Sequence, residues 1–166
     1  MMGIRKITIL GILTAIALTI FMIESALPAL APIPGIKLGL ANIVTLFILL
    51  RFQVMDACLA LFVRIILASV FAGQMVSFLY SICGGVLSLA VMALVNRLLN
   101  KKFIFLTSVF GGIAHNTGQI LASYFVLGMS GIFVYAPFLI ISGVVTGMFT
   151  GLICFYADRY IPRFEL

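Results

Sequence analysis

Residues Val54–Ala72 read VMDACLALFVRIILASVFA, and this segment decides the fold class. It is apolar apart from Asp56, Arg64 and Ser69, and its length is close to the roughly 20 residues that a helix needs to cross a bilayer. Lipid offers the backbone no hydrogen-bond partners, so only helices and closed barrels span it. Barrel strands show short segments of alternating polarity. The unbroken run therefore predicts a transmembrane α-helix.

The rest of the chain has the same character. Hydrophobic residues make up 64% of its 166 residues and charged residues 8%, whereas charged residues are about a quarter of a soluble domain. The mean hydropathy is +1.35. We expect an all-α membrane protein that forms a single integral membrane domain, residues 1–166, with about six transmembrane helices. The predicted spans are 7–27, 38–50, 54–72, 76–99, 103–127 and 132–157.

The basic residues lie singly at the ends of the apolar runs, which argues against nucleic-acid binding. Lys37 falls on one side of the predicted bundle. The other side holds Arg5, Lys6, Arg51, Arg97, Lys101, Lys102, Arg159 and Arg163. Cytoplasmic loops are enriched in Lys and Arg, so we expect both termini to be cytoplasmic. The stretch ALPALA at 26–31 is also similar to a signal-peptide cleavage site, but the preceding apolar run is long for a signal, and we expect it to be retained.

Arg64 lies near the middle of a predicted span, where an arginine costs about 2.5–3.5 kcal/mol. Asp56 precedes it by eight residues, which is about 12 Å along a helix axis and too far for a direct ion pair. The side chain therefore needs another partner. An anionic ligand group and backbone carbonyls are the alternatives.

The stretch GGIAHNTGQ, at residues 111–119, places polar groups inside another predicted span. His115, Gln119 and Ser123 recur every four residues and so share one helix face. Asn116 lies beside this face. These side chains either bind a ligand or link helices by hydrogen bonds. Asn42 begins a neighbouring predicted span and either caps that helix or binds a ligand.

The longest irregular segment, residues 28–37, includes Pro34, Gly35 and Lys37. Its prolines favour a stiff, extended backbone. It is predicted to be either a lid over an outward-facing site or a rigid connector. Glu24 and Lys37 flank it and could form an ion pair across it.

Two rows of small residues favour close helix packing in lipid. Gly143, Gly147 and Gly151 are expected to pack within the chain. Gly11 and Ala15 could pack either within the chain or against another subunit.

Known catalytic signatures are missing from the sequence. It has no Walker A motif, no HExxH motif and no nucleophile elbow. Its acidic residues number four, and they are scattered near the membrane edges without an aspartate-rich motif for magnesium diphosphate. We therefore expect no enzyme activity, no metal site and no cofactor.

Three stretches resemble the signatures of the Gx transporter family, which is also labelled heptaprenyl diphosphate synthase component I. They are PGIKLGLANIVTL at 34–46, RIILASVFAG at 64–73 and GGIAHNTGQ at 111–119. The family is similar in size and span pattern to the substrate-binding S components of energy-coupling factor (ECF) transporters. This resemblance implies a six-helix bundle in the bacterial plasma membrane, with an outward-facing site under the loop after the first helix. It also implies that Gly11 and Ala15 dock on an ECF transmembrane coupling subunit, which works with ATPases.

Three hypotheses follow. The first is a substrate-binding transporter subunit for a small vitamin-, flavin- or isoprenoid/quinone-related ligand, with Asn42, Arg64, His115, Asn116 and Gln119 as polar contacts. The second is a non-catalytic membrane anchor of an isoprenoid-synthesis or a flavin- and quinone-dependent extracellular electron-transfer system. The third is a proton-coupled carrier in which His115 titrates.

Overall fold

The computed structural model describes residues 3–26, 37–73, 75–99, 103–128 and 130–162. These residues form helices and no strands, which confirms the predicted helical bundle. The elements are α1 (Ile4–Ala26), α2 (Asn42–Arg51), α3 (Val54–Ala72), α4 (Met75–Leu98), α5 (Ile104–Leu127), the 3-10 helix η1 (Ser130–Tyr135) and α6 (Ala136–Tyr160).

Local sequence explains several helix limits. A capping box begins α3: the Asp56 carboxylate accepts a hydrogen bond from the Gln53 backbone N–H at 2.9 Å, as is common at helix starts. Helices α3 and α5 end at Gly73 and Gly128, whose φ angles are 63° and 62°. Glycine adopts this left-handed conformation without a steric penalty.

Four segments are long and apolar enough to cross a membrane: α1, residues 54–71 of α3, α4, and the η1–α6 segment from Gly131 to Tyr160. Helix α5 has 24 residues, but its buried polar side chains lower its hydropathy below that of the other four. The exposed faces of the long helices carry large apolar side chains, among them Ile12, Val63, Phe71 and Phe149. The protein is therefore a membrane protein whose outer surface suits lipid.

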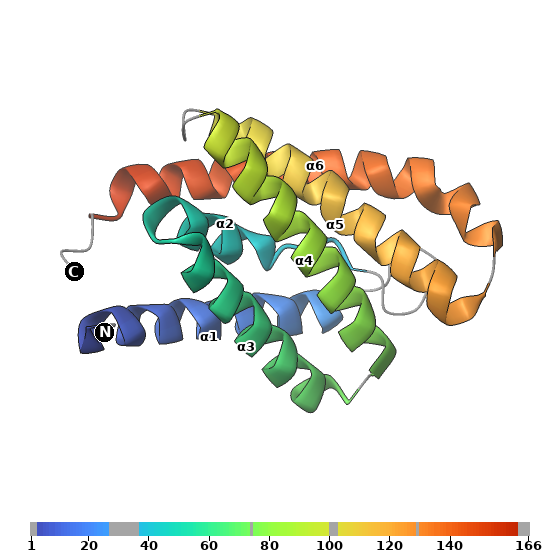
Figure 1. Ribbon diagram of the computed structural model, residues 1–166, viewed down its shortest axis with the longest axis horizontal. Helices are drawn as coiled ribbons and strands as arrows, with labels where there is room; N and C mark the ends of the chain where they lie inside the picture. The colour runs from blue at the N-terminus through green and yellow to red at the C-terminus, as the bar shows by residue number, and fades with distance from the viewer. Residues whose placement is uncertain (1–2, 27–36, 74, 100–102, 129, 163–166) are drawn as a thin grey trace.

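The predicted second span, residues 38–50, is already short for a crossing, and the helix found there is shorter still. Helix α2 has 10 residues, about 15 Å of helix, and a bilayer core is about 30 Å thick. It does not cross by itself. Instead it lies at the centre of the bundle, between α1 and α6 in Figure 1, and contacts all five long helices. Leu46 and Ile48 are fully buried there. A helix surrounded by protein is free of the length requirement that lipid imposes.

The first turn of α1 and the last turn of α6 lie at the same end of the bundle (Figure 1). Ion pairs at the α1–α3 and α2–α6 contacts join Lys6 to Asp56 at 2.8 Å and Arg51 to Asp158. These basic groups belong to the side that the sequence assigns to the cytoplasm. Their orientation relative to the cell remains a prediction.

The glycines of α6 pack against α5, as predicted. A Cβ atom added to Gly112 of α5 would lie 2.3 Å from the carbonyl oxygen of Gly143, and one added to Gly147 would lie 2.6 Å from the Cα atom of Val109. The two backbones are thus in direct contact. By contrast, Gly11 and Ala15 are exposed on the outer face of α1, and nothing lies within 4 Å of an added Cβ at Gly11.

Candidate functional site

A cavity lined by charged and polar side chains lies between α1, the start of α2, α3, α4 and α5. We call it the polar chamber. It is lined by Phe21, Glu24, Lys37, Gly39, Ala41, Asn42, Arg64, Ser81, His115 and Gln119. The non-atom space within it is about 230 Å³, part of it open to solvent. As packed, the chamber has room for about one water, so a larger ligand requires its walls to move apart.

A turn before α2 forms one wall of the chamber, and Glu24 of α1 holds it. The Glu24 carboxylate accepts hydrogen bonds from the backbone N–H groups of Gly39 at 2.7 Å and Leu40 at 3.1 Å. Gly39 has a φ of +81°, and a Cβ added to it would lie 2.6 Å from Cδ2 of His115, so the position needs glycine for both conformation and space. The carboxylate also lies at the positive end of the α2 dipole, which favours an anion.

This arrangement differs from the ion pair expected between Glu24 and Lys37. Among the described residues, the ion pairs within 4 Å join Lys6 to Asp56 and Arg51 to Asp158. Glu24 instead directs its oxygen atoms at the turn. Its attraction to Lys37 acts over a longer distance.

Arg64 is buried at 3% exposure in the chamber wall. Its Nε atom has no hydrogen-bond partner, and none of the described carboxylates lies within ion-pair distance of its guanidinium. The group lies 5.6 Å from the centroid of the Phe21 ring, and Glu24 attracts it from farther away. A buried guanidinium normally has a carboxylate, phosphate or carbonyl partner. Arg64 is therefore the incompletely compensated charge of the chamber.

His115 and Gln119 form a hydrogen-bonded row along α5. The Gln119 side-chain amide and Nε2 of His115 are 2.9 Å apart, and Gln119 Oε1 accepts a hydrogen bond from the Lys37 backbone N–H at 3.2 Å. With Gln119 Nε2 donating, His115 carries its proton on Nδ1, which faces Gly84 of α4. The row thus fixes a neutral imidazole and connects α5 to the segment before α2.

Lys37 lies outside the membrane-spanning helices and lines the chamber. Its Nζ atom lies 3.4 Å from the Phe21 ring centroid and donates a hydrogen bond to Ser25 Oγ. Burial lowers the pKa of Lys37 from 10.5 to about 8; the Glu24 carboxylate opposes this shift, and the charge of Arg64 adds to it. The ammonium group is thus charged at neutral pH and loses its proton more readily than an exposed lysine.

Not every predicted site residue lies in the chamber. Asn42, Arg64, His115, Gln119 and Lys37 line it.

Asn116 points elsewhere. Its side-chain amide donates a hydrogen bond to the Leu139 carbonyl of α6 at 2.6 Å. Ser123 pairs with the Tyr80 hydroxyl of α4 at 3.1 Å. Both contacts link helices. Pro34 and Gly35, the other residues of the predicted lid, lie outside the described residues.

The sequence did not single out Phe21 or Ser81, which line the chamber. A phenylalanine and a serine inside apolar helices carry no signal that distinguishes them from packing residues. Within the described part of the chain, no group of three or more His, Cys, Asp or Glu side chains is placed to hold a metal ion.

The fold and the chamber define a helical membrane protein with a charged cavity enclosed between its helices. A family model described as heptaprenyl diphosphate synthase component I matches residues 13–156. This match covers most of the chain, which therefore belongs to that family. Searches of curated proteins and of solved structures found no match.

Proposed function

We propose that the protein is a membrane-embedded substrate-binding subunit of a transporter, and that its polar chamber binds a small ligand with an anionic group. The observation that carries this proposal is Arg64, which is buried in the chamber wall with an unpartnered Nε and no carboxylate in ion-pair distance among the described residues. A guanidinium binds carboxylate or phosphate oxygens through two parallel hydrogen bonds. An anion at this position supplies the missing partner.

The charge of the chamber indicates how much negative charge the ligand carries. Lys37 and Arg64 contribute two positive charges, Glu24 contributes one negative charge, and His115 is neutral in the hydrogen-bonded row. One negative charge on the ligand balances the sum. A diphosphate carries more, and the described residues offer no metal cluster to offset it. The charge of the chamber therefore favours a singly charged ligand over a diphosphate.

Transport by such a subunit would require a partner protein that supplies the energy. The exposed Gly11 and Ala15 on the outer face of α1 suit close contact with a helix of another subunit. In the ECF reading, that subunit is the transmembrane coupling protein, which works with ATPases.

A second function is favoured by the family description, which names a component of a synthase. In that reading the chain is a non-catalytic membrane anchor, and the same face of α1 contacts the partner enzyme. That reading gives no role to the buried Arg64 Nε that lacks a hydrogen-bond partner.

Native mass spectrometry of the gently solubilised protein tests the proposal. The wild type should retain a small anionic molecule, and Arg64→Met should lose it while remaining monodisperse. Arg51→Met is the matched control, because Arg51 lies outside the chamber and pairs with Asp158; it should retain the molecule. Equal retention by the wild type and Arg64→Met would reject the site. A ligand-free wild type that carries a stoichiometric synthase subunit would favour the anchor.

A further inference from the structure

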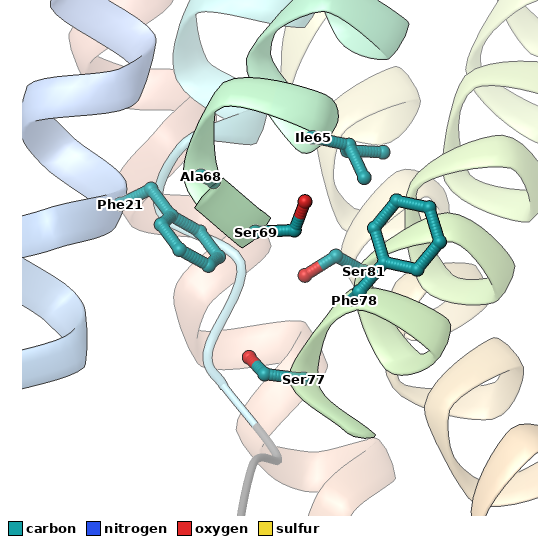
Figure 2. A pocket seen from close by; sticks show the side chains of 7 residues that line it. All are labelled: Phe21, Ile65, Ala68, Ser69, Ser77, Phe78 and Ser81. Atoms are coloured by element: carbon teal, nitrogen blue, oxygen red, sulfur yellow. The ribbon is translucent and has the colours of Figure 1, made fainter. Parts of the chain in front are cut away.

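A second cavity adjoins the polar chamber on the side of α3 and α4 (Figure 2). The non-atom space within it is about 170 Å³, but as packed it admits no water molecule, so a ligand requires its walls to move apart. It is lined by Phe21, Ile65, Ala68, Ser69, Ser77, Phe78 and Ser81. Phe21 and Ser81 also line the polar chamber. The two cavities thus share a wall of two side chains, which separates a charged space from a space lined by apolar groups and hydroxyls.

The hydroxyls of the second cavity are not equally satisfied. Ser69 donates a hydrogen bond to the Ile66 carbonyl at 2.7 Å. Ser77 is 3% exposed, and its Oγ atom has no hydrogen-bond partner. In Figure 2 the side chains of Ser77 and Ser81 point from α4 toward Phe21. A buried hydroxyl without a partner is unfavourable, and a ligand that moves the walls of this cavity apart would supply the missing partner.

We propose that the second cavity is a subsite for the body of the ligand whose anionic group binds at Arg64. This inference rests on the proposed function. The ligand is then an amphipathic monoanion: the charged group lies in the polar chamber, an apolar body lies against Phe21 and Ile65, and a polar substituent hydrogen-bonds to Ser77. Small inorganic anions and uniformly polar ligands leave the second cavity unused.

Aromatic monocarboxylates are suitable probes, because the apolar side chain of Phe21 lines both cavities. Binding of acetate, benzoate and para-hydroxybenzoate to the purified full chain in lipid nanodiscs can be measured by isothermal titration calorimetry. Benzoate should bind at least about tenfold more tightly than acetate, because its ring buries additional apolar surface. Para-hydroxybenzoate should bind more tightly again, through Ser77.

Two variants separate the subsite from the anion site. Ser77→Leu fills the second cavity. It should lower the affinity for benzoate to that for acetate and leave the affinity for acetate unchanged. Ser77→Ala removes only the hydroxyl and should cancel the advantage of para-hydroxybenzoate over benzoate. Ser142→Leu, on α6 and lining neither cavity, is the control and should change no affinity.

The outcomes distinguish the two proposals. Equal affinities for acetate and benzoate in the wild type, or a Ser77→Leu protein that keeps the preference for benzoate, would overturn the subsite and leave the anion site standing. Failure of all three probes to bind would overturn both. If Ser77→Leu does not fold, Ser77→Ala decides: an unchanged preference for para-hydroxybenzoate would overturn the contact with Ser77.

Discussion

Replacement of Arg64 by methionine distinguishes a binding site from a structural ion pair. A residue that holds the fold together destabilises it when removed. Removal of a charge that serves to bind a ligand should instead stabilise the empty protein, because burial of that charge costs free energy when no ligand is bound. Methionine retains the apolar stem and removes only the charge.

The magnitude follows from the surroundings of the guanidinium. Burial of an arginine at membrane depth costs about 2.5–3.5 kcal/mol. The cation–π contact with the Phe21 ring at 5.6 Å offsets about 0.5–2 kcal/mol of this cost. The attraction of the more distant Glu24 carboxylate offsets a further part. Arg64→Met should therefore raise the free energy of unfolding by about 1–2 kcal/mol. For a chain of this size, that corresponds to a rise of about 2–8 °C in Tm.

Thermal unfolding of the ligand-free protein in detergent, followed by far-UV circular dichroism, measures the effect. Arg51→Met is the matched control. Arg51 pairs with Asp158 and donates to the carbonyl oxygens of Asp158, Ile161 and Pro162, so its loss should destabilise the fold by about 1–3 kcal/mol. A Tm that falls by a similar amount in Arg64→Met would refute the reasoning and make Arg64 a structural residue.

Three further predictions use the same preparations. Gly112→Ala should lower the free energy of unfolding by about 1–3 kcal/mol, because its Cβ would lie 2.3 Å from the Gly143 carbonyl oxygen. Gly11→Ala is the control and should leave Tm nearly unchanged, because its Cβ meets no atom within 4 Å. Glu24→Gln should destabilise the turn before α2 by about 1–3 kcal/mol, since a neutral amide oxygen replaces the carboxylate that accepts its two N–H groups; an unchanged melt would count against this capping role. Benzoate affinity should fall as the pH rises through about 8, where Lys37 loses its charge, and a Lys37→Met protein should show no such fall; identical pH profiles would exclude the lysine from the site.

The helix limits were predictable because lipid imposes a strong constraint on sequence. The predicted span 54–72 coincides with α3, and the span 103–127 differs from α5 by one residue at its start. The prediction was wrong for α2, because hydropathy cannot distinguish a helix that faces lipid from one surrounded by other helices. Residues 38–41 are also apolar enough to extend a helix, yet Gly39 and the Glu24 carboxylate turn the chain there.

The composition of the site was predictable only in part. Arg64, His115 and Gln119 stand out because ionisable and amide groups are expensive in lipid. Asn116 stands out for the same reason but lies one residue from His115, about 100° around the helix, and so it faces α6. A list of buried polar residues does not give the direction of each side chain.

The position of Glu24 bears on where the proposed anionic ligand would bind, since it favours Arg64 over the N-terminus of α2. A helix N-terminus inside a membrane cavity is a natural anion site, and α2 opens into the polar chamber. Its N-terminal turn, however, already has a carboxylate on the N–H groups of Gly39 and Leu40. An incoming anion at that place would meet the negative charge of Glu24. The remaining attractive positions are the guanidinium of Arg64 and the ammonium of Lys37, and both groups lie near the ring of Phe21. We expect the anionic group of the proposed ligand to lie near that ring, with its body extending toward the second cavity, which Phe21 also lines.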